Sequence, residues 1–124
     1  MTGLTFDTGA LIALERRRQN IARVFTTAVV DGLIINVPAV VVSEWWRGQT
    51  KARATILRAV RVEPLDTELA KLAGEAMASV RNAAAVDAIV MASAARRGDV
   101  VYTSDYDDLT RLQSYFGSVR VLSV

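Results

Sequence analysis

The chain has 124 residues, of which 52% are hydrophobic, enough for the core of one domain over residues 1–124 and too many for a disordered chain. It contains no cysteine and no histidine, which excludes disulfides, Cys/His zinc sites, cysteine nucleophiles and Ser-His-Asp triads. The net charge is +2. Only Lys51 and Lys71 of the 15 basic residues are lysines, and the other 13 are arginines, a bias that suits phosphate or carboxylate partners but that a GC-rich genome also produces. Because cysteine and histidine are both absent, any acid–base or metal chemistry must come from Asp and Glu.

The chain alternates short apolar strands with helices. Continuous apolar or β-branched runs predict strands at residues 4–6, 33–37, 60–65, 100–103 and 119–122. Apolar residues at helical spacing predict helices at 8–14, 21–29, 38–48, 52–59, 66–76, 86–97 and 106–116. Strands separated by helices pair in parallel through right-handed crossovers. We therefore expect a three-layer α/β/α sandwich with a mostly parallel central sheet.

The sequence shows no targeting segment and no membrane span. Asp7 interrupts the apolar run near the amino terminus, so this region does not resemble a signal peptide. No stretch approaches the roughly 18 apolar residues that a membrane-spanning helix needs. We expect a cytoplasmic protein without membrane contact.

Several acidic residues stand where a parallel sheet places its functional site. Ligands of open parallel sheets bind beyond the carboxyl ends of the strands. Asp7 follows the first predicted strand directly, and Asp105 follows the fourth by one residue, with Asp107 and Asp108 close behind. Asp87 lies at the start of the helix predicted for residues 86–97.

Glu44 is the acid that is hardest to explain structurally. Its i−4 and i−3 neighbours are Val40 and Val41, which places a carboxylate on an apolar stripe of its predicted helix. Burial there costs several kcal/mol unless the charge is paired or binds a metal. Arg47 at i+3 offers an ordinary helix ion pair as the alternative.

Together these acids predict a cation site, although Asp7, Asp87 and Asp105 are each also placed to cap a helix. Three or four carboxylates at one sheet edge would raise one another's pKa values unless a divalent cation neutralised them. Carboxylate oxygens are the ligands that Mg²⁺ and Mn²⁺ prefer. Without histidine, a metal-activated water is the route to a nucleophile near neutral pH, and in-line attack on a phosphodiester is typical of such sites.

Four short segments occur in a characteristic order. They are Asp7-Thr8 after a strand, Ser43-Glu44-Trp45-Trp46-Arg47-Gly48 in a helix, Asp87-Ala88-Ile89-Val90-Met91-Ala92, and Val101-Tyr102-Thr103-Ser104-Asp105. In this order they resemble the PIN-domain family. The likeness extends from about Leu4 to Val121 and is similar to the single-domain VapC ribonucleases, the toxins of VapBC toxin–antitoxin pairs.

The resemblance implies an Mg²⁺- or Mn²⁺-dependent endoribonuclease that hydrolyses RNA phosphodiester bonds, forms a homodimer and is inhibited by a VapB-type antitoxin. It places the catalytic and metal-binding acids at Asp7, Glu44, Asp87 and Asp105, with Thr103 and Asp108 in support. In this reading the three aspartates hold one or two metal ions, and Glu44 binds or orients the attacking water.

The chain departs from the family pattern at three places. Gly9 stands where serine or another small residue is more common, and Trp45-Trp46 replaces a commoner aliphatic. Asp107 and Asp108 both follow Asp105, which leaves open which of the three is the fourth acid; we prefer Asp105 because it is nearest the strand end.

Alternatives come from three other classes. Asp7-Thr8-Gly9-Ala10 spells the aspartic-protease signature, but that fold is all-β and the following segment is helical. A receiver-like phosphoacceptor domain needs a second acid near the first strand and a lysine near the last strand. Here Asp7 is the lone acid at the first strand, and the only lysines are Lys51 and Lys71. A catalytically inactive PIN-like module that binds RNA or a protein fits the same residues as the nuclease, and loss of metal-dependent cleavage in Asp7→Asn distinguishes the two.

Arginines are the predicted RNA contacts. We expect Arg47, Arg96 and Arg97 to touch RNA, together with Arg53 and Arg58, because arginine suits phosphate. The run Arg16-Arg17-Arg18 is open to two interpretations, a phosphate-binding patch or a solvated helix end where the macrodipole favours cations.

Overall fold

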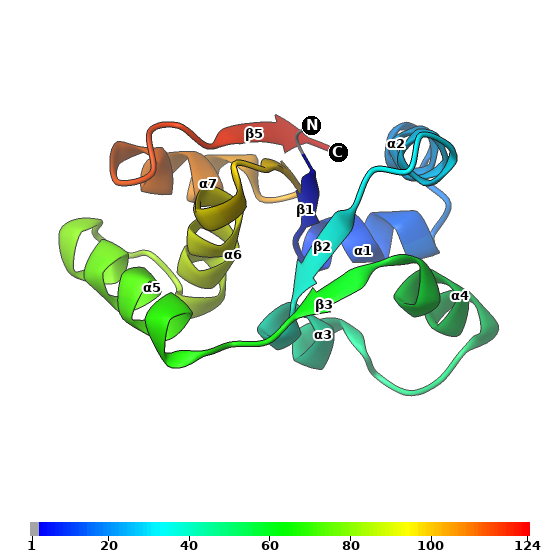
Figure 1. Cartoon of the computed structure of the whole chain (residues 1–124), viewed down its shortest axis with the longest axis horizontal. Helices are drawn as coiled ribbons and strands as arrows, with labels where there is room; N and C mark the ends of the chain where they lie inside the picture. Colours follow the sequence, from blue (N-terminus) through cyan, green and yellow to red (C-terminus); the bar gives the residue numbers. More distant parts are fainter. Residues whose placement is uncertain (1–2) are drawn as a thin grey trace.

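The computed structural model describes residues 3–124, which form a five-stranded sheet with helices on both faces (Figure 1). The strands are β1 (Leu4–Phe6), β2 (Ile35–Pro38), β3 (Arg61–Glu63), β4 (Val100–Thr103) and β5 (Arg120–Ser123). The helices are α1 (Thr8–Glu15), α2 (Gln19–Val30), α3 (Ala39–Trp45), α4 (Lys51–Ala59), α5 (Thr67–Ser79), α6 (Ala85–Arg97) and α7 (Tyr106–Arg111), which continues as a 3-10 turn, η1 (Leu112–Ser114). The sheet order is β3-β2-β1-β4-β5, and every neighbouring pair is parallel. The predicted α/β/α sandwich is confirmed.

Two groups of helices cover the two faces of the sheet. In Figure 1, α1, α2 and α4 lie on one side of the strands, and α5, α6 and α7 lie on the other. Helix α3 packs against both α1 and α6 beside the carboxyl end of β2. The elements that carry the predicted site residues are therefore in mutual contact at one edge of the sheet.

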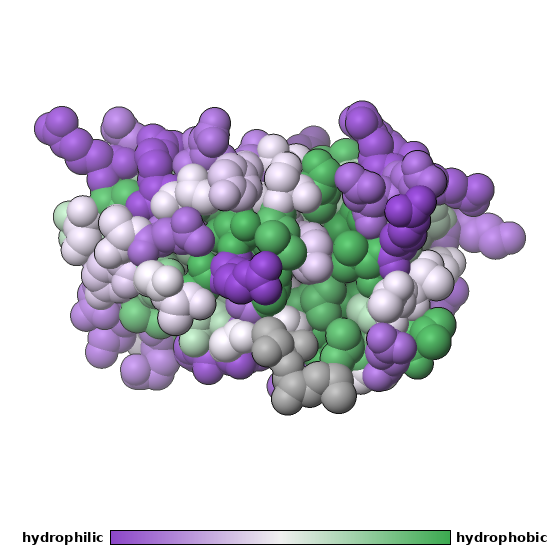
Figure 2. Space-filling model, turned by 90° about the horizontal axis from the view of Figure 1, so that it is seen from above, coloured by the Kyte–Doolittle hydropathy of each residue, from purple (hydrophilic) through white to green (hydrophobic). Residues whose placement is uncertain are grey.

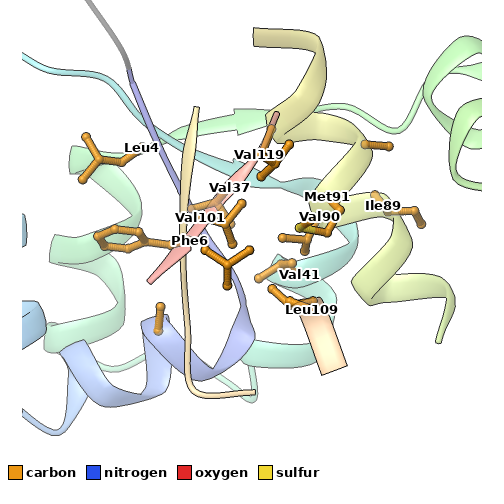
Figure 3. Packing of buried hydrophobic residues seen from close by; sticks show 14 of the residues in the cluster. Leu4, Phe6, Val37, Val41, Ile89, Val90, Met91, Val101, Leu109 and Val119 are labelled. Carbon is orange, nitrogen blue, oxygen red and sulfur yellow. The ribbon is translucent and has the colours of Figure 1, made fainter. Parts of the chain in front are cut away.

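Helix α6 is the central helix of its layer. Its residues 88–94 are all buried because the sheet, α5 and α7 enclose it on every side. Figure 3 shows Val90 and Met91 of α6 beside Val41 of α3 and Leu109 of α7 in the hydrophobic core. This packing fixes where α6 begins, and so fixes the position of its first turn.

Several predicted boundaries differ from the structure; the strand predicted for residues 60–65, for example, is β3 over Arg61–Glu63 only. Leu33 does not belong to β2 because its N–H donates to the carbonyl of Ala28 and so completes the turn after α2. Helix α3 ends at Trp45 rather than at Gly48. The last predicted helix, residues 106–116, is α-helical only to Arg111 and then tightens into η1. None of the helices between residues 3 and 124 has both the length and the apolar character needed to span a membrane.

Candidate active site

The site lies at the point where the strand order reverses. From β1 the chain moves outward through β2 and β3, and then crosses back to β4 and β5 on the other side of β1. Such a switch point leaves a crevice beyond the carboxyl ends of the two central strands, here β1 and β4. Asp7 follows β1 directly, and Asp105 follows β4 with Ser104 between them.

Asp7 is a buried acid that both caps a helix and faces this crevice. Asp7 is only 4% exposed. Oδ1 accepts a hydrogen bond from the N–H of Ala10 at 2.8 Å, which makes Asp7 the N-cap of α1, and Oδ2 accepts one from the Thr103 hydroxyl. It forms no ion pair with any residue from 3 to 124. Burial therefore raises the pKa of the Asp7 carboxyl to about 6, although its two hydrogen bonds favour the charged form.

The Thr103 hydroxyl ties the two central strand ends together. Besides donating to Asp7, it accepts a hydrogen bond from the N–H of Asp105 at 2.7 Å. Asp105 occupies the N-cap position of α7, but its side chain makes no capping hydrogen bond and is exposed. Its carboxylate is therefore available to a ligand in the crevice.

Asp87 enters the crevice from the opposite layer. The N-cap of α6 is Ala84, so the interpretation of Asp87 as a capping residue is wrong; it is the third residue of the helix, in the first turn. A carboxylate there is favoured by the helix dipole. Its residue is only partly exposed because it directly precedes the fully buried segment of α6.

Neighbouring acids act on Asp87. Burial is the largest cause that raises the pKa of its carboxyl to about 6, and the charges of Asp105, Asp108 and Glu44 raise it further. Arg111 acts in the opposite direction. The fold thus brings the acids of four separate segments within electrostatic reach of one another.

Glu44 differs from the sequence-based expectation because it is exposed rather than buried. The core-facing residues of α3 are Val41 and Trp45, one turn apart, and Glu44 projects beside that stripe. Its Oε1 accepts a hydrogen bond from the Thr8 hydroxyl at 2.6 Å. Arg47 does not pair with the carboxylate; its Nε donates to the Glu44 carbonyl at 2.9 Å.

The acids that follow Asp105 have different surroundings. Asp108 pairs with Arg111 one turn later, and it is among the charges that raise the pKa of Asp87. Asp107 is exposed, and its carbonyl accepts from the Thr110 hydroxyl.

The donor set fits a hard divalent cation. All of the acids concerned offer carboxylate oxygens, and Asp7 is buried without a compensating positive charge. Among residues 3–124, no three acidic side chains stand close enough to form a preassembled ligand set. Mg²⁺ is commonly held by one or two carboxylates with the remaining positions filled by water, so this arrangement accommodates it.

Arg97 is not brought to this site. It lies ten residues after Asp87, which corresponds to about 15 Å along the axis of α6. Its guanidinium donates to Asp99 Oδ2 at 2.9 Å, Thr5 Oγ1 at 3.0 Å, Ser93 Oγ at 2.9 Å and Glu63 Oε2. Asp99 is buried and also accepts from Thr5 and from Asn36.

Arg96 belongs to the same network. It pairs with Glu63 and with Asp66, both at 3.3 Å. Both arginines were expected from the sequence to contact RNA, but in the fold their charges meet carboxylates at the far end of α6. Arg47, in contrast, is exposed and lies beside Glu44.

Two residues of the site were not anticipated. Thr8 positions Glu44, and Arg111 pairs with Asp108 and lowers the pKa of Asp87. The spacing of Asp108 and Arg111 at i and i+3 carried a signal for the second contact. No local pattern links Thr8 to Glu44, because they are 36 positions apart.

Comparisons with known proteins agree with this arrangement. The sequence matches the PIN domain over residues 4–114. Among solved structures, DNA-bound VapBC from Salmonella typhimurium aligns with a TM-score of 0.74 at 17% identity, over 99% of this chain and 98% of that chain. VapBC2 from Rickettsia felis, bound to a DNA fragment from its promoter, gives 0.75 at 9% identity, over 98% of each chain.

A further similar structure is FitAcB from Neisseria gonorrhoeae, with a TM-score of 0.62 at 21% identity over 96% of each chain. No curated protein sequence matches the chain significantly. At these identities the solved structures establish the fold, while the sequence match covers most of the chain. The chain belongs to the PIN domain family.

Proposed function

We propose that this protein is a divalent-metal-dependent endoribonuclease that acts as the toxin of a toxin–antitoxin pair. PIN domains are generally nucleases. The observation that carries the proposal is Asp7, a buried carboxylate at the switch point with no positive partner among residues 3–124 and with other acids close enough to raise its pKa. Burial and the neighbouring acids disfavour the charged form of Asp7, and a bound divalent cation would offset both effects.

The acids have separate roles in this proposal. Asp7, Asp87 and Asp105 would together attract the cation, with one or two of their carboxylates as direct ligands; when bound, it would neutralise charge on the attacked phosphate and lower the pKa of water. Glu44 is exposed and fixed by the Thr8 hydroxyl, so it can orient a water molecule and accept its proton.

The supporting residues hold these acids in place. Thr103 orients the Asp7 carboxylate and the backbone of Asp105 through one hydroxyl. Asp108 adds negative charge beside Asp87, and its pairing with Arg111 restrains it. Of the arginines assigned to RNA from the sequence, Arg47 is the one beside the site, and we propose it as a phosphate contact.

Protein partners form the second part of the proposal. The similar VapBC and FitAB structures are toxin–antitoxin complexes bound to DNA, which supports an antitoxin partner for this chain.

Hydrophobic residues gather in the middle of one side of the molecule (Figure 2). Val29, Val30 and Ile34 are 51%, 77% and 51% exposed. We propose that the protein forms a homodimer in the cytoplasm, a state that sedimentation equilibrium of the purified chain measures.

The test of the catalytic proposal is cleavage of a total cellular RNA pool. Purified protein is incubated with Mg²⁺, with Mn²⁺ or with EDTA, beside Asp7→Asn and a matched control, Asp31→Asn, which removes an exposed carboxylate at the end of α2. We expect discrete cuts that require metal, persist in the control and disappear in Asp7→Asn. Cutting that survives Asp7→Asn would identify a contaminating nuclease. Metal-independent RNA binding without any cutting would instead identify a non-catalytic binding module.

A further inference from the structure

A groove lies along one face of α1, beside the segment that carries Asp105. Its volume is about 510 Å³. The floor is formed by residues that share one face of the helix, at i, i+3, i+4 and i+7: Gly9, Ile12, Ala13 and Arg16. The remaining walls are Ser104 and Val124 beside the floor, and Arg18, Gln19 and Asn20 at the start of α2.

One end of this groove adjoins the acids. Ser104, which lines this end, also lines a neighbouring hollow together with Asp105, Asp107 and Asp108. The other end is marked by Arg16, about 10 Å beyond Gly9 along α1 at 1.5 Å per residue. The groove therefore adjoins the segment that carries Asp105, one of the acids of the proposed cleavage site.

The far end of the groove carries uncompensated positive charge. Arg16 and Arg18 are exposed, and neither forms an ion pair with any residue in the described range 3–124. The arginine beside the acids, Arg111, is in contrast paired with Asp108. Since the acid cluster repels phosphates, the phosphates that flank a cleaved bond need cations farther away, and Arg16 and Arg18 stand in that position.

We infer that this groove binds the backbone of the RNA strand on one side of the cleaved bond, with Arg16 and Arg18 contacting its phosphates. The inference rests on the proposed nuclease function. The apolar floor residues Ile12 and Ala13 suit the sugars and base faces of that segment.

An acidic peptide is the competing occupant. It would satisfy the two arginines, but nothing in an acidic peptide requires it to extend toward the acids, which repel carboxylates and phosphates alike. An RNA strand cut at the acid site must leave that site in both directions, so one of its arms has to follow a neighbouring surface. The position of the groove beside the site therefore favours RNA.

The binding test uses a labelled single-stranded RNA of 12 nucleotides and mixed sequence. It is measured on protein carrying Asp7→Asn, which prevents cleavage, at several KCl concentrations. The double variant R16Q/R18Q is compared with R61Q/R120Q, a control that removes two exposed arginines at the starts of the edge strands β3 and β5, at the opposite end of the sheet. Circular dichroism verifies that both variants are folded.

We expect R16Q/R18Q to flatten the slope of log Kd against log salt by about 1.4, or 0.7 per phosphate contact on a single strand. This corresponds to about 25-fold weaker binding at 0.1 M salt. R61Q/R120Q should leave the slope unchanged. Equal slopes in the two variants overturn the inference. The inference is also overturned if R16Q/R18Q weakens the binding of a 12-residue polyglutamate but leaves the salt slope for RNA unchanged. That result would assign the groove to an acidic peptide.

A cleavage measurement separates this inference from the proposed function. With Asp7 intact, R16Q/R18Q should raise KM for the 12-nucleotide RNA and leave kcat/KM for a dinucleotide unchanged, since a dinucleotide does not reach the arginines. Equal losses on both substrates count against the groove. If the unaltered chain cuts neither substrate, the nuclease proposal fails, and the salt slopes still decide whether the groove binds RNA.

Discussion

Gly9 and Ser104 are packed so closely that a Cβ at position 9 would stand 1.7 Å from Ser104 Oγ and 2.7 Å from Ser104 Cβ. Gly9 lies in the first turn of α1, and Ser104 lies between β4 and Asp105. This contact explains why Gly9 departs from the serine that is more common in the family: here the side chain that fills the space comes from Ser104. The size of residue 9 therefore sets the position of the segment that carries Asp105.

Substitution of Gly9 by alanine should destabilise the protein. Alanine ordinarily favours a helix over glycine by about 1 kcal/mol, but the clash involves Ser104 Cβ and not only its hydroxyl, so the backbone has to shift. We expect a net loss of about 1–3 kcal/mol in the free energy of unfolding, measured by urea denaturation. The double variant G9A/S104G should regain most of this loss. A double variant as unstable as G9A alone would contradict the steric explanation.

Asp7→Asn should stabilise the metal-free protein at neutral pH. The carboxyl has a pKa of about 6 in the folded chain against its ordinary value of 3.8, so between these values the folded state holds a proton that the unfolded state has lost. Stability due to this group is present below pH 3.8 and is lost as the pH rises to 6, which corresponds to about 3 kcal/mol.

The variant avoids that loss, although it weakens the hydrogen bond from Thr103, worth about 1 kcal/mol. We therefore expect a higher melting temperature than the unaltered chain at pH 8 in EDTA, and no advantage at pH 3.5. Addition of Mg²⁺ at pH 8 should raise the melting temperature of the unaltered chain and not that of the variant. A variant that is less stable at pH 8 would show that capping of α1 is the main role of Asp7.

Thr103→Val should move the acidic limb of the cleavage rate to higher pH. The hydrogen bond from the Thr103 hydroxyl lowers the pKa of Asp7, so its removal should raise that pKa further. We expect the acidic limb of the rate to move up by about half to one pH unit. It also leaves the N–H of Asp105 without its acceptor. Thr103→Ser retains the hydroxyl and should keep the original profile. A lower rate without any shift of the pH profile would assign Thr103 a purely structural role.

Arg97→Gln should reduce stability rather than RNA binding. Its guanidinium is the positive partner of the buried Asp99 and also pairs with Glu63, so its loss leaves uncompensated charge under α6. We expect a loss of about 3 kcal/mol in the free energy of unfolding and an unchanged affinity for RNA. Arg47→Gln provides the comparison, with the reverse pattern expected because Arg47 is exposed beside Glu44. Weaker RNA binding by a fully stable Arg97→Gln would restore the sequence-based assignment.

The sequence predicts the architecture well because each element carries its own local signal. Runs of apolar residues mark β1 and β4 with the boundaries that the structure has, and Gly98, with its positive φ of 75°, ends α6 where a glycine was expected to. The boundary at Leu33 could not be predicted, because the hydrogen bond from its N–H to Ala28 competes with the sheet only once α2 is formed.

The candidate site is less accessible to such reasoning. The order of the strands is a tertiary property, and it alone brings the segment after β4 beside the segment after β1. Helical periodicity placed Glu44 on a stripe with Val40 and Val41, whereas packing against the core selects Val41 and Trp45 and leaves Glu44 exposed. The network around Arg97 was also hidden, because its partner Thr5 is 92 positions away.

The hydrogen bond between Thr103 and Asp7 joins residues separated by 96 positions in the chain. During synthesis Asp7, Glu44 and Asp87 are all made before β4, whose last residue, Thr103, supplies the hydroxyl that orients Asp7. Truncated or prematurely released products that end before β4 therefore carry Asp7, Glu44 and Asp87 but lack both Thr103 and Asp105. Translation of this protein delays the assembly of its own site until nearly all of the sequence has been read.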